Sequence, residues 1–246
     1  MFKKILQQIQ QKLIGKKNLI PSWINEVAQK YSTLFAQKVL HEVILPTEDA
    51  LCAQISEESY HEVAQRKQQL ESYHLADKYS TGSACVYVDE QAKRCIIWYR
   101  GTVVTDVHDI ASDAQIVLDV QWIDPRVQEA LHFYDTIKRE FPGYAIWVCG
   151  HSLGWTFSYI VAKHRIPARC VVFNPGVSLN TFFVQMLEDT LRKKVWTQNT
   201  YTYKILGDII STVAFVGHVK TFVIKADNPL ALHLLINFLT HKTVET

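Results

Sequence analysis

CGHSLGWTF, residues 149–157, places Ser152 midway between Gly150 and Gly154, directly after the apolar run YAIWVC. A G-x-S-x-G spacing suits a sharp turn from a strand into a helix, because the serine is strained there and side chains at the glycine positions would collide with their neighbours. Such a turn lifts the hydroxyl clear of the backbone and aims the first amides of the helix at the reacting atom. The stretch predicts a nucleophile at Ser152 and an oxyanion donor in the N–H of Leu153, although a serine that merely caps a helix remains an alternative.

The segments on either side of this stretch alternate between strand and helix patterns. A hairpin is predicted at ACVYVD and RCIIWYR, and a helix at RVQEALHFYDTIKRE. After Ser152 come the expected strand CVVFN, helix TFFVQMLEDTLRKK, strands YTYKIL and VKTFVIK, and helix ALHLLINFL. This alternation predicts an α/β fold whose sheet is mostly parallel and covered on both faces. Active sites of such sheets lie at the carboxyl ends of the strands.

The chain before this region has a helical pattern rather than an alternation of strands and helices. Residues 22 to about 74 are predicted to be helical, with Pro46 between two periodic stretches. No low-complexity linker and no internal repeat separates the two regions. The sequence therefore predicts a helical N-terminal extension over residues 1–74 and an α/β domain over residues 75–246.

The first twenty residues predict an amphipathic helix. Five lysines precede the first acidic residue, Glu26, and the apolar residues that share one helical face are Phe2, Ile5, Leu6, Ile9 and Leu13. Such a helix either makes a peripheral contact with an anionic membrane or packs on the protein's own core. No signal-peptide apolar region follows the lysines, and no run of about 18 apolar residues is long enough for a transmembrane segment. We expect a cytoplasmic protein.

Composition narrows the function classes further. The 246 residues are 48% hydrophobic and 20% charged with a net charge of +2, and no basic stripe with interleaved aromatic residues predicts nucleic-acid binding. The five cysteines form no C-x-x-C pair, which is typical of a reducing compartment. The spacing of His, Cys, Asp and Glu predicts no metal site.

A serine nucleophile needs a histidine base and an acid that follow it in the chain. Asp208 ends the run YKILGD, so it is expected at the carboxyl end of a strand. His233 in NPLALHLLINFL is the preferred base, because the start of a helix can lie over the top of the sheet. His218 in FVGHVK is the rival, although it is expected to begin a strand at the opposite edge.

A second oxyanion donor is expected after an early strand. In the stretch IIWYRGTVV, Gly101 permits a close approach of the backbone, and Thr102 offers both its N–H and its hydroxyl. Thr102 and Leu153 are therefore the predicted oxyanion hole.

The motifs RGT, TDVHDIASD, GHSLG and GD, in this order, resemble the class 3 lipase family of α/β-hydrolases, particularly its compact bacterial and viral members. The stretches FNPGVS, ILGDIIS and HLLINFL are similar to the same parts of that family. The resemblance covers residues 75 to 240 and implies an α/β-hydrolase fold. It also implies hydrolysis of acylglycerols, phospholipids or other lipid esters without a cofactor, with Ser152, His233 and Asp208 as catalytic triad. Residues 103–124 occupy the place of the family's lid, or form an ordinary buried element.

Two departures from the family pattern leave alternatives open. Trp155 stands where a small residue is usual, so either the helix is displaced, or the indole forms a wall of the acyl pocket, or it is repacked into the core. The chain is also short for a lipase with a deep pocket. The alternative function is a non-catalytic lipase-fold module in membrane docking or structural assembly. A thioesterase or peptidase that uses the same triad is a third possibility.

Overall fold

The structure is a computed structural model. The described residues are 39–40, 44–101, 125–176, 186, 189–206, 208, 211, 214–224, 233–239 and 242–244. The predicted amphipathic helix at the amino terminus lies outside them.

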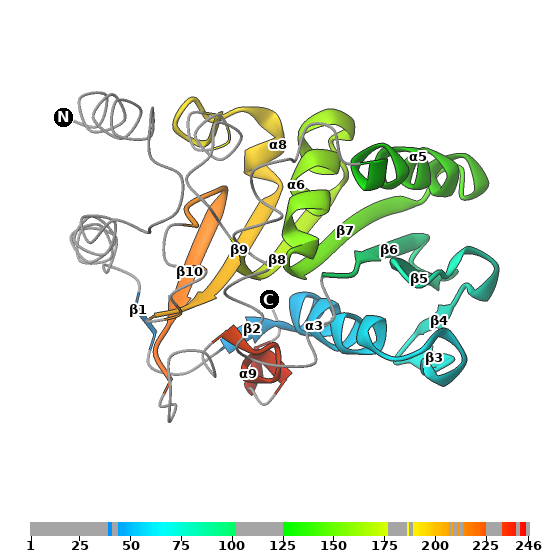
Figure 1. The fold of residues 1–246 in the computed structure, drawn as a ribbon, viewed down its shortest axis with the longest axis horizontal. Coiled ribbons are helices and arrows are strands. Elements are labelled where there is room, and N and C mark those ends of the chain that lie inside the picture. Colours follow the sequence, from blue (N-terminus) through cyan, green and yellow to red (C-terminus); the bar gives the residue numbers. More distant parts are fainter. Residues whose placement is uncertain are drawn as a thin grey trace. The chain divides into compact units, whose positions relative to one another are not determined.

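A mixed sheet of nine strands organises the described part of the chain, in the order β1-β10-β9-β8-β7-β6-β5-β4-β3 (Figure 1). In this order, the neighbouring strands β1, β10, β9, β8, β7 and β6 are parallel to one another. The neighbours β6, β5, β4 and β3 pair antiparallel. The strands are β1 Val39–Leu40, β3 Gln69–Leu70, β4 Tyr73–Leu75, β5 Ala84–Asp89, β6 Arg94–Tyr99, β7 Ala145–Ser152, β8 Arg169–Pro175, β9 Thr200–Ile205 and β10 His218–Phe222. A separate parallel pair is formed by β2 Ile44–Pro46 and β11 Lys242–Val244.

Helices cover both faces of this sheet (Figure 1). One face carries α5, Pro125–Glu140, α6, Gly154–Arg165, and α8, Val195–Gln198. The other carries α3, Thr47–Tyr60, and α9, Ile236–Leu239. Short 3₁₀ turns, η2 at Val63–Gln65 and η3 at Asp77–Tyr79, flank the edge strands.

The central strands are buried on both sides, and their side chains alternate between the two layers. In β5, Val86 and Val88 pack with the α5 and α6 layer, whereas Cys85 and Tyr87 pack with the α3 layer. This two-residue period follows from the pleat of a strand. The runs of apolar residues without polar alternation in the sequence are explained by this double burial.

The sheet order and the strand-turn-helix at Ser152 identify an α/β-hydrolase fold with a mostly parallel sheet, as the sequence predicted. The predicted hairpin of residues 84–99 is present as β5 and β6. Every connection between parallel strands requires a crossover, and α6 provides the one between β7 and β8.

The segment Lys38–Thr246 forms one compact unit, so the chain from Lys38 to residue 74 is continuous with the α/β domain rather than separate from it. The carboxylate of Asp49 in α3 is fully buried and accepts two hydrogen bonds of 2.7 Å from Arg169 of β8, and a third from the hydroxyl of Tyr203. This pairing joins α3 to the sheet, because an unpaired buried carboxylate would be costly.

Helix was predicted over residues 22 to about 74, but residues 39–40 and 44–46 are strands, helix α3 ends at Tyr60, and residues 69–70 and 73–75 are strands as well. Three-residue strands are too short to display a period, and β4 is fixed by pairing with β5 and by burial of Tyr73 and Leu75. The residues before Lys38 lie outside the described part, so a helical extension there stays a prediction.

The cysteines and the length of the helices were both features that the sequence analysis considered. All five cysteines are buried and none is paired in a disulfide. None of the helices in the described ranges has the length and apolar character needed to cross a bilayer.

Candidate active site

The turn between β7 and α6 is strained at one residue. Ser152 ends the strand with a φ of 51°, which is in the left-handed region that residues with a side chain rarely adopt. Leu153 returns to helical angles, and α6 begins at Gly154. Such strain at a single polar residue is typical of a nucleophile held away from its own backbone.

Both glycines of the motif are required by close contacts. A Cβ atom on Gly150 would lie 2.4 Å from the carbonyl oxygen of Gly154, and one on Gly154 would lie 2.2 Å from the carbonyl oxygen of Tyr99. Both distances are far below van der Waals contact, and both obstacles are backbone atoms that cannot yield cheaply. The interpretation of the spacing drawn from the sequence agrees with these contacts.

Trp155 lies on a different side of α6 from this close approach. Its side chain is 1% exposed and packs in the core between the sheet, α5 and α6. The indole Nε1 donates to the carbonyl oxygen of Gly176, and the ring meets Tyr159 edge-on at 5.0 Å between centroids. The position that must stay small is therefore Gly154, and a large residue one position later is accommodated as part of the core.

Three predicted residues meet above the carboxyl ends of the strands. The Oγ of Ser152 lies 3.0 Å from Nε2 of His233, and Nδ1 of His233 lies 2.9 Å from Oδ2 of Asp208. Asp208 follows β9, and His233 lies just before α9. Asp208 is 0% and His233 2% exposed. The buried carboxylate accepts a hydrogen bond from Nδ1–H, which leaves the unprotonated Nε2 free to accept the hydroxyl proton of Ser152.

The hydroxyl of Ser211 supports the acid. Its Oγ donates to Oδ2 of Asp208 at 2.6 Å, the same oxygen that accepts from His233. Hydrogen bonds to a carboxylate favour its charged form. The sequence analysis did not single out Ser211, although a serine three residues after an acid in a loop is a common local partner.

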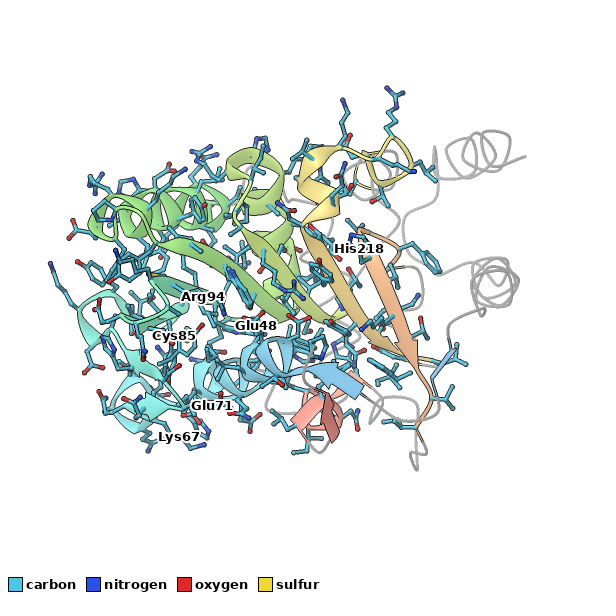
Figure 2. The ribbon with its side chains drawn as sticks, turned by 180° about the vertical axis from the view of Figure 1, so that it is seen from behind. Glu48, Lys67, Glu71, Cys85, Arg94 and His218 are labelled. Carbon is cyan, nitrogen blue, oxygen red and sulfur yellow. The ribbon has the colours of Figure 1, made fainter. Side chains whose placement is uncertain are left out.

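His218 does not join this group. It is the first residue of β10 (Figure 2). Because β10 runs parallel to β9, His218 lies at the amino end of its strand, whereas Asp208 follows the carboxyl end of β9. Its Nε2 is 2.9 Å from the carbonyl oxygen of Gln198, and its ring stacks on Tyr201. The preference for His233 over His218 agrees with this geometry.

The predicted oxyanion hole is described only in part. Leu153 lies between β7 and α6, and Gly101 lies against it, because a Cβ on Gly101 would be 3.3 Å from the backbone nitrogen of Leu153. The chain before Thr102 therefore approaches the turn as expected. Thr102 itself and the predicted lid, residues 103–124, lie outside the described residues.

His151, which the sequence analysis passed over, is buried beside the base. Its Nε2 lies 2.9 Å from the backbone oxygen of His233, and its Nδ1 lies 3.0 Å from the hydroxyl of Tyr60. Burial, reinforced by the neighbouring His233, lowers the pKa of His151 from 6.5 to about 3. The ring is therefore neutral at neutral pH. Its side chain points to the α3 layer because it alternates with Gly150 along β7.

Asn174 at the end of β8 holds the same carbonyl group. Its Nδ2 donates to the backbone oxygen of His233 at 3.0 Å, and its Oδ1 accepts from the backbone N–H of Ile205 at 2.9 Å. The residue is fully buried and has a φ of 38°, a conformation that asparagine tolerates better than most residues. One side chain thus joins the base to the end of β9, the strand that precedes Asp208.

A buried lysine lies near the acid. Lys204 of β9 is 4% exposed, and its Nζ lies 3.7 Å from the centroid of the Phe215 ring. Burial lowers its pKa from 10.5 to about 7, and the negative charge of Asp208 opposes that change. No sequence pattern distinguishes it, because a lysine in a strand is usually exposed.

The buried neutral ring of His151 gives a pH-dependent stability. Its folded pKa of about 3 is below its unfolded value of 6.5, so only the unfolded chain binds this proton between these values. Stability from this group is complete above pH 6.5 and is lost as the pH falls toward 3. As the pH falls from 6.5 toward 3, we expect the free energy of unfolding of the wild type to decrease by about 1.4 kcal/mol per pH unit more than that of the His151→Gln variant.

Urea unfolding of both proteins between about pH 4 and about pH 7 measures this difference. The variant controls for all other titrating groups, because glutamine does not ionise. Equal slopes for the two proteins would contradict the burial of a neutral His151.

The described residues contain no group of three or more His, Cys, Asp or Glu side chains that could hold a metal ion. The polar groups near Ser152 are a hydroxyl, an imidazole, a carboxylate and backbone amides at a helix start, which are the kinds of group that acyl transfer requires.

No family model and no curated protein sequence matches the chain. Among solved structures, it is similar to the Lip2 lipase of Yarrowia lipolytica, with 16% identity, coverage of 71% of this chain and 77% of that one, and a TM-score of 0.46. A propeptide complex of a deletion mutant of Rhizomucor miehei lipase has 11% identity, coverage of 79% and 77%, and a TM-score of 0.47. Lipase II of Rhizopus niveus has 13% identity, coverage of 68% and 73%, and a TM-score of 0.43.

Proposed function

We propose that this protein is a serine hydrolase of the class 3 lipase type, which cleaves carboxylic esters of lipids through an acyl-enzyme on Ser152. The observation that carries the proposal is the unbroken chain of contacts from Ser152 through His233 to Asp208, with distances of 3.0 and 2.9 Å. These distances are within hydrogen-bond reach, as general-base catalysis requires.

The proposed reaction has two halves. The Oγ of Ser152 attacks the ester carbonyl while Nε2 of His233 takes its proton, and the carboxylate of Asp208 stabilises the imidazolium. The developing oxyanion is stabilised by the N–H of Leu153, at the start of α6, and by the predicted donor Thr102. His233 then gives its proton to the departing alcohol.

Water completes the cycle in the second half. It attacks the acyl carbonyl and gives a proton to Nε2 of His233, and the fatty acid leaves as this proton returns to the Oγ of Ser152. Ester and water are consumed and an alcohol and an acid are formed, so the cycle requires no cofactor.

Apolar side chains around the base and the acid support a lipid substrate. Leu206 precedes Asp208 by two residues, and Leu234 and Ile236 follow His233 by one and three. All three are exposed. Exposed apolar residues next to reactive groups favour a substrate with hydrocarbon chains over a polar one. Contact with a membrane through the amphipathic helix of the first twenty residues, and action in a reducing cytoplasmic compartment, belong to the same proposal.

A fluorophosphonate probe tests the proposal directly. It reacts with a serine only when a base activates the hydroxyl, so we expect labelling of Ser152, identified by mass spectrometry of the digested protein. Absence of label on folded protein, or label on another serine, would contradict the proposal. Hydrolysis of triacylglycerol, phospholipid and acyl-thioester substrates then separates the substrate classes, and preference for the thioester would correct the proposed class.

A further inference from the structure

The hydroxyl of Tyr60 enters the site from a part of the chain that the motifs do not cover. Tyr60 is the last residue of α3, and it lies 91 positions before the residue that it contacts, His151. Its Oη lies 3.0 Å from Nδ1 of His151 and close to Gly101, because a Cβ on Gly101 would lie 3.0 Å from this oxygen. Three segments that are distant in sequence therefore meet at one oxygen atom.

The direction of each hydrogen bond follows from the acceptor at the far end. The backbone oxygen of His233 has no proton, so Nε2 of His151 must carry one and donate it. Because His151 is neutral, its Nδ1 carries no proton and must accept. The hydroxyl of Tyr60 is therefore the donor to His151.

Arg100 contacts Tyr60 at two places, its backbone oxygen and its ring. The guanidinium of Arg100 donates from Nη2 to the backbone oxygen of Tyr60 at 3.3 Å and lies 6.0 Å from the centre of the ring. Burial raises the pKa of the Tyr60 hydroxyl, while the positive charge of Arg100 opposes and the negative charge of Glu57 reinforces that change. The hydroxyl is thus protonated and able to donate near neutral pH.

We propose that Tyr60 is a positioning residue, which acts through His151 to hold the backbone of His233 so that its ring stays within reach of Ser152. This inference rests on the proposed function. Asn174 donates to the same carbonyl from β8, so two neighbouring strands, β7 and β8, fix the backbone of the base. The same hydroxyl also packs closely against Gly101, the residue before the predicted donor Thr102.

The consequence is that the chain before residue 75 completes the site. A base displaced by about 1 Å from its productive position can lose about 100-fold in rate, even when no reacting group is removed. Tyr60 touches none of the three triad side chains in the described contacts, so its effect must pass through His151 and Gly101.

The test compares Tyr60→Phe with Tyr87→Phe. Both substitutions remove one hydroxyl from a tyrosine; that of Tyr87, in β5, donates to the backbone oxygen of Lys67 at 2.7 Å. We expect Tyr60→Phe to lower kcat for a soluble ester by about 10- to 100-fold with KM changed by less than about threefold. We expect Tyr87→Phe to leave both constants unchanged, with a similar loss of thermal stability. Equal kcat values for the wild type and Tyr60→Phe would overturn the inference.

Nitrogen NMR of ¹⁵N-histidine-labelled protein gives a readout that does not require hydrolysis. In the wild type, we expect His151 as the neutral tautomer with the proton on Nε2. In Tyr60→Phe, we expect the same tautomer with a shifted Nδ1 resonance, because Nδ1 loses its donor, together with shifted resonances of His233. A charged His151 near neutral pH, a proton on Nδ1, or His233 resonances unchanged by the substitution would overturn the inference. Failure of the fluorophosphonate probe to label Ser152 would instead count against the proposed function alone.

Discussion

Replacing Ser152 by alanine is expected to lower kcat for ester hydrolysis by about 10⁴-fold or more. The substitution removes the atom that becomes acylated, while His233 and Asp208 stay paired at 2.9 Å. The remaining rate would come from the oxyanion donors and from substrate binding, which do not need the hydroxyl. Initial rates on a p-nitrophenyl ester, with enzyme concentration determined by absorbance, measure the effect.

Ser158→Ala is the matched control. Ser158 lies in α6, one helical turn after Gly154, and its buried hydroxyl donates to the backbone oxygen of Gly154 at 3.1 Å. Loss of this bond is expected to cost about 1 kcal/mol of stability and to change kcat by less than about threefold. A Ser152→Ala protein that is folded and retains hydrolysis near the wild-type rate would mean that another group is the nucleophile.

The turn at Ser152 was predictable because its requirements are local. Two glycines and a serine within five residues, between an apolar strand and a helix, determine the backbone path, and the contacts at Gly150 and Gly154 explain why. Asp208 and His233 were predictable in a weaker sense. Their chain order after Ser152 and their places at the ends of elements limited the choice, and His218 was separable because it begins a strand.

The contacts that hold the triad were not predictable in the same way. Tyr60 and His151 meet because α3 packs on the face of the sheet to which His151 points, and that packing depends on the buried pair of Asp49 and Arg169, 120 residues apart. No local pattern reports such a distance. The short strands β3 and β4 were not predicted because a local pattern was too short. Two or three residues carry too little periodicity to be distinguished from a loop or a helix end.

Replacing Trp155 by alanine is expected to cost about 3 to 5 kcal/mol in the free energy of unfolding and to leave the acyl-chain preference unchanged. The indole is 1% exposed, it meets Tyr159 edge-on, and it joins α6 to the residue after β8 through the bond to the oxygen of Gly176. A cavity of indole size beside Tyr159 cannot close without moving α6, which itself approaches β6 as closely as Gly154 permits. Urea unfolding and rates on p-nitrophenyl esters of increasing chain length measure the two quantities.

Trp155→Phe separates the two contributions of the indole. It keeps an aromatic ring in the core but removes the Nε1 donor, so the oxygen of Gly176 loses a partner at a cost of about 1 to 3 kcal/mol, in addition to a smaller packing loss. The order of stability is therefore expected to be wild type, Trp155→Phe, Trp155→Ala, with one common chain-length profile. If Trp155→Ala instead kept its unfolding midpoint and shifted its preference toward longer acyl chains, the indole would be a wall of the acyl site. The small residue expected after GHSLG would then be a determinant of substrate size, whereas the structure makes Gly154 the position where size is limited by the backbone of Tyr99.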